Sequence, residues 1–174
     1  MKNFKKILFI IGLFIFTQNN TLADTPYFLD FKYILNESDA GKKAQSFLKN
    51  KLEKGIKDLK SKETKIQEEE KKIIQQKKII SAEEYKKKVT DLRSKVSALQ
   101  KERNLLLESV AKQRTKARNE LLRNLNPIIK DYMKEKKIRM VVDKKSLLLA
   151  DENLNITKDI MSLLNKKLKS IKLN

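Results

Sequence analysis

Few side chains of this 174-residue sequence could carry out chemistry, because it contains no cysteine and no histidine. Thiol nucleophiles, imidazole bases and the commonest zinc ligands are therefore missing. The three glycines, Gly12, Gly41 and Gly55, are too scattered to form a phosphate-binding loop. The run of three glutamates and two lysines at 68–72 is typical of a solvated helix face. We predict no enzymatic activity, no metal and no cofactor.

One spacing does have a definite chemical meaning. Ser81 and Glu84 match a capping box, in which Ser81 accepts from the amide of Glu84 and the Glu84 side chain reaches back. The pair lies in the middle of a segment without proline, from Phe28 to Asn126, that is rich in helix-forming residues. The sequence therefore predicts two long helices with a turn near Ser81.

Heptad periodicity supports a fold-back at this turn. One apolar series precedes it: Leu52, Leu59, Ile66, Ile73, Ile80. Two follow it: Val89, Val96, Arg103, Val110, Ala117 and Tyr85, Leu92, Leu99, Leu106, Gln113. In an antiparallel hairpin, the numbers of two facing residues add up to a constant. For a turn centred on Ser81 this constant is 162, twice 81. The pairs expected in one layer are Leu52 with Val110, Ile66 with Val96, and Ile73 with Val89. The second layer would pair Ile56 with Leu106, Glu63 with Leu99, Glu70 with Leu92, and Lys77 with Tyr85.

The N-terminus has the organisation of a secretory signal. Residues 1–6 are basic, residues 7–16 are apolar, and residues 21–23 offer small side chains for cleavage. Ten apolar residues are few for a bilayer span, so a retained anchor is the weaker alternative. We predict a bacterial secretory signal that is cleaved after Ala23.

The remaining segments predict a small β-containing body at the base of the hairpin. Strand candidates are 27–31, 138–143 and 146–150, with a loop at 151–155. A terminal helix is expected from Thr157, with an apolar face made of Ile160, Leu163, Leu164, Leu168, Ile171. Asn126-Pro127 predicts a kink or a helix restart.

So small a sheet with open edges favours completion by other copies of the chain. The candidate oligomerisation residues are Phe28, Leu29, Phe31, Met140, Val141, Val142, Leu148. The fold class is mainly α with a small β body, from which a long antiparallel coiled-coil hairpin projects. The predicted organisation is a signal peptide (1–23), a composite body (24–41 and 127–174) and the hairpin (42–126).

Positive charge is concentrated on the hairpin. The chain has a net charge of +19, and residues 42–125 hold 25 basic and 12 acidic side chains. Candidate contacts with a partner are Tyr85, Lys86, Lys87, Lys88, Leu92, Leu99. The alternative is that the stems of Glu63, Glu70 and neighbouring lysines cover these leucines.

The sequence resembles the Skp/OmpH family of periplasmic chaperones over essentially its whole length. The resemblance rests on the stretch 35–45, Leu-Asn-Glu-Ser-Asp-Ala-Gly-Lys-Lys-Ala-Gln, on the lysine-rich hairpin, and on the stretch 138–157 with its Val-Val-Asp and Asn-Ile-Thr. It implies a homotrimer whose helical arms enclose unfolded outer-membrane proteins. It also implies lipopolysaccharide or an anionic membrane surface as a further candidate partner, which we assign to no particular lysine. The chain departs from the family in having few aromatic residues along the arms.

The leading interpretation is a holdase chaperone that needs no ATP. Two other functions compete with it. A basic coiled coil could bind nucleic acid, but the export signal and the acids interspersed along the arms disfavour this, so no nucleic acid is expected. A structural or adaptor coiled coil of the cell envelope is the stronger alternative. Such a hairpin should dock through a specific apolar tip, whereas residues 79–82 read Ile-Ile-Ser-Ala.

Overall fold

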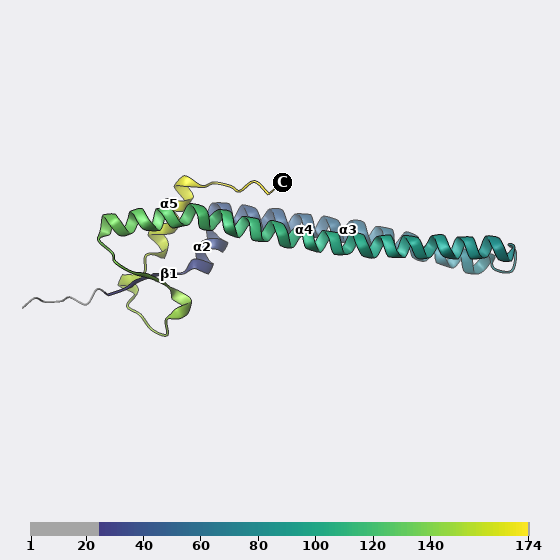
Figure 1. The fold of residues 1–174 in the computed structure, drawn as a ribbon, viewed down its shortest axis with the longest axis horizontal. Coiled ribbons are helices and arrows are strands. Elements are labelled where there is room, and N and C mark those ends of the chain that lie inside the picture. The colour runs from purple at the N-terminus through teal and green to yellow at the C-terminus, as the bar shows by residue number, and fades with distance from the viewer. Residues whose placement is uncertain (1–24, 174) are drawn as a thin grey trace, which may run out of the picture.

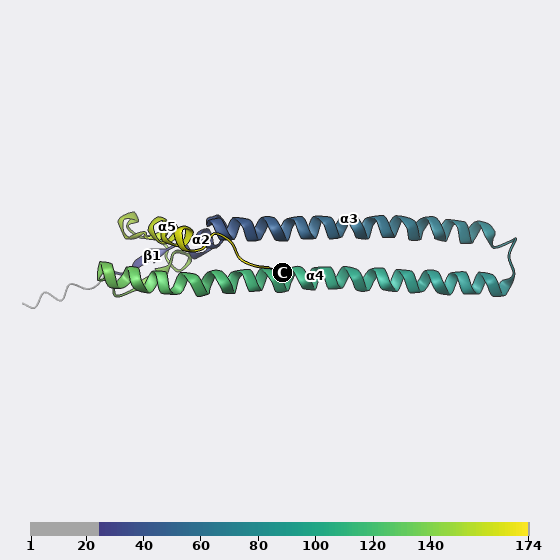
Figure 2. The same ribbon diagram turned by 90° about the horizontal axis from the view of Figure 1, so that it is seen from above.

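A computed structural model describes residues 25–173, and the expected signal peptide lies outside them. The elements run in the order β1 (Tyr27–Leu29), α2 (Phe31–Glu37), α3 (Asp39–Gln76), α4 (Ala82–Lys136), β2 (Val141–Asp143) and α5 (Thr157–Lys167). Single 3-10 turns at Lys144–Ser146 and Glu152–Leu154 lie between β2 and α5. The helices α3 and α4 form a long antiparallel hairpin that extends from a small body (Figures 1 and 2). The predicted fold class is confirmed.

Side-chain caps mark the start of α2, α3 and α4. Asp30 accepts from the amide of Tyr33 at 2.8 Å to begin α2, and Ser38 accepts from Gly41 at 3.2 Å to begin α3. Ser81 accepts from the amide of Glu84 at 3.2 Å and begins α4. Each cap satisfies an amide that has no partner inside its helix. The chain thus turns between Gln76 and Ala82.

Of the kink or restart expected at Asn126-Pro127, the restart is wrong, because the helix α4 passes through Pro127 without interruption. Proline removes one backbone donor from the helix. Here Leu125 and Ile128, on either side, are buried in the core of the body and hold the helix in place. The helix ends at Lys136, and the left-handed backbone of the next residue, Lys137 (φ 55°), lets Ile138 donate to the carbonyl of Met133 at 2.8 Å.

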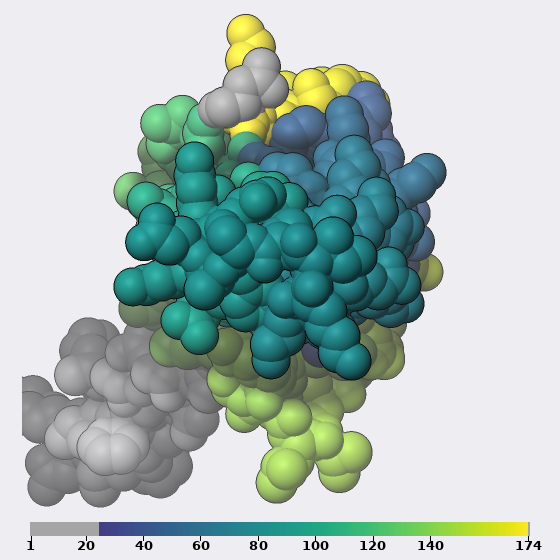
Figure 3. All heavy atoms as spheres, turned by 90° about the vertical axis from the view of Figure 1, so that its right-hand side faces the viewer, coloured from purple at the N-terminus to yellow at the C-terminus, as the bar shows by residue number. Residues whose placement is uncertain are grey.

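The sheet of the described residues is smaller than expected. Tyr27–Leu29 and Val141–Asp143 pair in parallel, with Phe28 opposite Val142, and Phe28 also bridges to Asn155. The first strand stops at Leu29 because Asp30 caps α2. The predicted strand at 146–150 is wrong: Asp143 caps a 3-10 turn there, and Leu148 and Leu149 are 101% and 94% exposed. The segment after β2 stands out from the body below the arms (Figure 3).

The core of the body lies between α2, the base of α4, β1 and α5. Its buried members are Leu29, Ile34, Ala40, Leu121, Leu125, Ile128, Ile138, Ile156, Ile160, Leu164. It therefore draws residues from both sides of Pro127. Two of the apolar residues expected on the terminal helix lie beyond it. Leu168 is the C-cap of α5, and Ile171 lies in the extended tail. Both still pack against this core.

Candidate functional site: the hairpin arms and their base

The apolar heptads lie between the two arms, as their spacing requires. Ile73 is buried, and the other members of its series (Leu52, Leu59, Ile66, Ile80) are half-buried. On α4 the series from Tyr85 to Gln113 is half-buried throughout, whereas Val96 is 50% exposed. The seam is thus narrow, and each arm leaves most of its surface in water.

Polar pairs alternate with the apolar layers at heptad spacing. Lys88 donates to Gln76 at 3.2 Å, Lys95 pairs with Glu69 at 2.6 Å, and Lys62 pairs with Glu102 at 2.5 Å. The residue numbers of each pair sum to 164. Most of these side chains are partly exposed, so each pair adds little stability, but three such rungs specify one register. We name this set the polar ladder.

Three pairs of the second layer expected from the sequence are wrong by one residue on α3, whereas the fourth pair, Lys77 with Tyr85, is in contact. Ile56, Glu63 and Glu70 are exposed. The positions before them face α4 instead: Gly55, Lys62 and Glu69. Heptads of apolar residues could not reveal this layer, because its members are polar or lack a side chain. Oppositely charged residues whose numbers add up to a constant, such as Lys62 and Glu102, could have revealed this layer.

Gly55 allows a close approach of the arms. A β-carbon at this position would lie 2.5 Å from Cδ2 and 2.7 Å from Cδ1 of Leu106. The Leu106 side chain therefore fills the space that any other residue would take.

The hairpin turn combines exposed cations with one exposed isoleucine. The Lys77 ammonium lies 5.8 Å from the ring centroid of Tyr85, which is half-buried. Lys86 and Lys87 are exposed, Lys88 is held by Gln76 and Glu84, and Ile79 is 83% exposed. Leu92 and Leu99 lie in the seam. Of the six candidate contacts, Lys86 and Lys87 are therefore accessible, Lys88 is held in place, and the other three face the opposite arm.

The C-terminal tail crosses one face of the arm base. Leu173 is buried against Ala44, Leu48 and Ala117, and its carbonyl accepts from Gln113 Nε2 at 2.6 Å. Lys51 joins the arms beside this contact by donating to Ser109 at 2.8 Å and to Gln113 at 3.0 Å. The tail thus holds α3 and α4 at a fixed separation where they leave the body.

An ion pair fixes the start of this tail. Lys169 Nζ lies 2.9 Å from Asp39 Oδ2, and Asp39 donates its amide to Asn165 Oδ1 at 2.8 Å. The hydrogen bond from Lys169 holds the pKa of Asp39 below its usual value. These contacts join the end of α5 to the start of α3.

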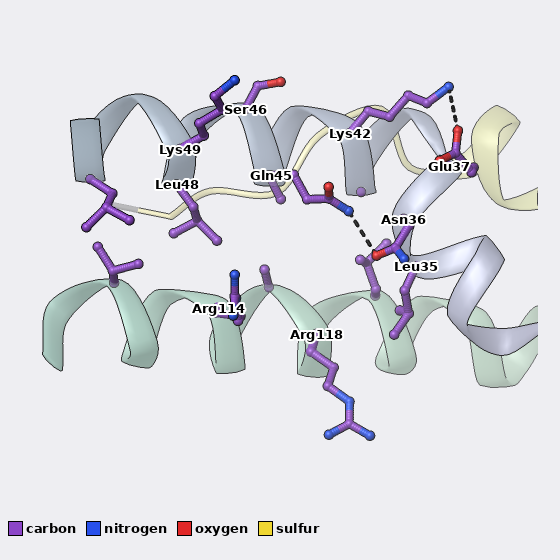
Figure 4. A pocket seen from close by; sticks show the side chains of 16 residues that line it. Leu35, Asn36, Glu37, Lys42, Gln45, Ser46, Leu48, Lys49, Arg114 and Arg118 are labelled. Atoms are coloured by element: carbon purple, nitrogen blue, oxygen red, sulfur yellow. Dashed lines mark hydrogen bonds and ion pairs between the residues drawn. The ribbon is translucent and has the colours of Figure 1, made fainter. Parts of the chain in front are cut away.

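The opposite face of the arm base is an open groove of about 930 Å³ (Figure 4). Its floor is apolar and its rim is polar. The floor residues are Leu35, Ala44, Leu48, Leu52, Val110, Ala117, Leu121. The rim includes Lys42, which pairs with Glu37 at 3.0 Å, and Gln45, which donates to Asn36 at 2.9 Å. The Glu37 carboxylate raises the pKa of Lys42.

The expected oligomerisation residues divide by exposure. Phe28 and Leu29 are buried within the subunit, and Phe31, Val141 and Val142 are half-buried. Met140 and Leu148 are exposed at 56% and 101%. Among these seven residues, the exposed apolar side chains therefore lie beside β2 and in the segment that follows it.

Residues 25–173 contain no candidate metal site, since no group of three or more potential metal ligands gathers there. Across the same residues, no helix has the length and apolar character to cross a membrane. What this surface offers is a long basic hairpin, a small body and a groove where they meet.

These features define a class of protein in which a two-helix hairpin is carried by a small α/β body. A family model described as outer membrane protein (OmpH-like) matches residues 27–164. The chain belongs to the OmpH-like family, as the resemblance in its sequence indicates.

A solved structure has the same fold. The crystal structure of a Caulobacter crescentus CB15 protein, assigned as an OmpH-like outer membrane chaperone, superposes with a TM-score of 0.79 at 21% sequence identity. The match covers 85% of this chain and 89% of the other. No functionally curated protein matches the sequence.

Proposed function

We propose that this protein is a periplasmic holdase, which binds unfolded outer-membrane proteins after export and prevents their aggregation without ATP. The observation that carries this proposal is the hairpin itself, whose two long arms present a strongly basic surface around a narrow apolar seam. Membership of a chaperone family supports it. Binding by many weak contacts is the chemistry that such a surface provides, and no residue needs to act as a catalyst.

The positive charge of the arms should raise the rate at which they capture clients. The 25 basic side chains of residues 42–125 attract an acidic unfolded chain over a distance set by salt, about 10 Å at 0.1 M and about 3 Å at 1 M. Apolar contacts then slow dissociation. The exposed Lys86 and Lys87 at the turn, with Lys88, are placed to meet a client first.

We further propose that the working form is a homotrimer assembled through the body. Met140, Leu148 and Leu149 are exposed apolar side chains beside a sheet of two strands, and such an edge accepts further strands. Three arms around one axis would surround a client. Light scattering of the mature protein in solution tests the subunit number.

The proposed activity is tested by diluting a urea-unfolded, acidic outer-membrane β-barrel protein into buffer with and without the mature protein. We expect aggregation to be suppressed without nucleotide, and capture to slow strongly between 0.1 and 1 M salt. Replacing Lys86, Lys87 and Lys88 together with glutamine should lower the association rate more than it raises dissociation. Aggregation equal to that of the client alone would reject the holdase.

An adaptor of the cell envelope remains the second candidate, and Ile79 is the observation that favours it. This side chain is 83% exposed at the tip, where a docking hairpin would present an apolar contact. Ile79→Lys separates the two functions: it should leave aggregation suppression unchanged if the arms hold clients, and abolish function in the cell if the tip docks a partner.

A further inference from the structure

We propose that the groove at the arm base is a binding site for an extended segment of the unfolded client in which apolar side chains lie next to carboxylates. This inference rests on the proposed function and assigns part of the binding to one face of the arms. It follows from three features: the open apolar floor, its continuation along the arms, and the arginines beside it.

The two faces of the arm base differ in what covers them. Ala44, Leu48 and Ala117 pack against Leu173 of the tail on one face and line the groove on the other. The tail face is therefore closed by the chain itself. Within residues 25–173 no segment closes the groove face, and its floor remains open to a second polypeptide.

The apolar floor continues along the arms beyond the groove. Ile56 lies one turn after Leu52 on α3, and Leu107 lies one turn before Val110 on α4. Ile56 is 55% exposed and Leu107 is 53% exposed. The strip thus extends further than a compact ligand needs. It suits an extended chain, such as a strand of an outer-membrane barrel, in which apolar side chains recur at every second residue.

Guanidinium groups that pair with no described residue lie on the groove side of α4. Lys42 and Lys49 on the α3 rim are paired with Glu37 and Glu53, at 3.0 and 3.8 Å. Arg114 and Arg118 line the groove, yet neither hydrogen bonds nor ion pairs join them to any residue of the range 25–173. Figure 4 shows Arg118 extending outward from the rim.

Arg103, seven residues and two turns before Val110, continues the row of arginines and also has no ion pair with a described residue. The three arginines span about 22 Å of helix at 1.5 Å per residue. This spacing suits carboxylates distributed along a polypeptide, whereas the phosphates of one lipid headgroup would need a compact cluster. Guanidinium groups bind carboxylates through two parallel hydrogen bonds. The structure therefore favours an acidic polypeptide over an anionic lipid.

Leu105 and Leu107 provide a matched test. Both are 53% exposed on α4, but they flank Leu106 on opposite sides, so only Leu107 is on the groove side. A photoreactive amino acid at position 107 should cross-link to an unfolded, acidic outer-membrane β-barrel protein, and one at position 105 should cross-link much less. Equal yields at the two positions would overturn the proposal, as would cross-links at 107 only to another copy of the chain or to added lipopolysaccharide.

The arginines are tested by affinity. Arg114→Gln with Arg118→Gln should weaken client binding by about 3- to 10-fold. The control, Lys101→Gln with Lys112→Gln, removes the same charge from the side that carries Leu105 and should change it by less than about 2-fold. Equal losses would mean that net charge alone acts and would overturn the site. If only the groove site is wrong, the unmodified protein still suppresses aggregation. If the unmodified protein does not suppress aggregation, both the holdase and the groove site are rejected.

Discussion

The ammonium group of Lys95 lies 2.6 Å from both carboxylate oxygens of Glu69, at a seam position where a stable coiled coil would place apolar side chains. The pair is the middle rung of the polar ladder. It fixes which residues of the two arms face each other while leaving the arms weakly packed.

Replacing this rung with apolar residues should therefore stabilise the hairpin. We expect Glu69→Ile with Lys95→Leu to add about 1 kcal/mol to the free energy of unfolding, because apolar surface is buried where a partly exposed ion pair stood. Thermal unfolding followed by circular dichroism measures the change. Lys95→Leu alone, which leaves Glu69 without its cation, is the control and should gain less. A lower melting temperature for the double variant would contradict this account.

The register of the arms can be tested by cysteine pairs. Ile73→Cys with Val89→Cys should form an intramolecular disulfide readily, because both side chains point into the seam near the turn. Ile73→Cys with Val110→Cys should not, since these positions are five to six helical turns apart along the arms. Mass spectrometry after mild oxidation gives the yields. Similar yields for both pairs would refute the register.

Gly55 should resist a substitution that normally stabilises helices. Glycine to alanine inside a helix usually gains about 1 kcal/mol. Here the new methyl group would meet Leu106 at 2.5 Å, so we expect Gly55→Ala to give no gain or a loss. In a Leu106→Ala background the same change should recover its usual benefit. Chemical unfolding of the four proteins forms a double-mutant cycle, and additive effects would show that Leu106 does not fill this space.

Tyr132 should titrate unusually late. Its hydroxyl donates to Asp159 Oδ2 at 2.6 Å, and this hydrogen bond raises the pKa of Tyr132 from 10.0 to about 12. Since the pKa is higher in the folded state, the stabilisation is fully present below about pH 10 and is lost as the pH rises through about 12. The difference in ultraviolet absorbance between the wild type and Tyr132→Phe measures this titration. Asp159→Asn should move the pKa back toward 10.0, and an unchanged value would exclude the hydrogen bond as its cause.

Assembly should depend on the exposed apolar segment after β2. Leu148 is 101% exposed, so Leu148→Asp costs the isolated subunit nothing in packing but would place a charge in an interface between copies. We expect a folded protein of lower mass by light scattering. Ile74→Asp, at an exposed position on the arm, is the matched control and should leave the mass unchanged. An unaltered oligomer with Leu148→Asp would place the interface elsewhere.

The sequence predicted the hairpin well because its signals are local. The cap at Ser81 and the seven-residue series through Ile73 act within a few turns of helix, and the structure has a turn and a seam at these positions. The strand predicted at 146–150 failed for a complementary reason. Three leucines in a row indicate a buried strand only if something buries them, and a single subunit does not cover Leu148 or Leu149.

The base of the arms was beyond reach of pattern analysis. The groove and the tail contact depend on residues such as Ala44, Ala117 and Leu173, which come together from three distant parts of the chain. Ala117 continues a heptad series of α4, but no periodicity relates it to Leu173 of the tail. Pro127 is the opposite case. The local signal at this proline predicts an interruption of the helix, but the tertiary packing of Leu125 and Ile128 keeps the helix continuous.

The pairing of Tyr27 with Val141 also has a kinetic consequence. The two strands are 114 residues apart, a separation that makes a contact slow to form in an unfolded chain. The hairpin between them forms from near neighbours, starting at its turn, and once zipped it brings its two ends together. We therefore expect folding to proceed from the tip toward the base, with the sheet closing last. If subunits assemble through the body, as we propose, a newly made chain would become competent to associate only after this final step.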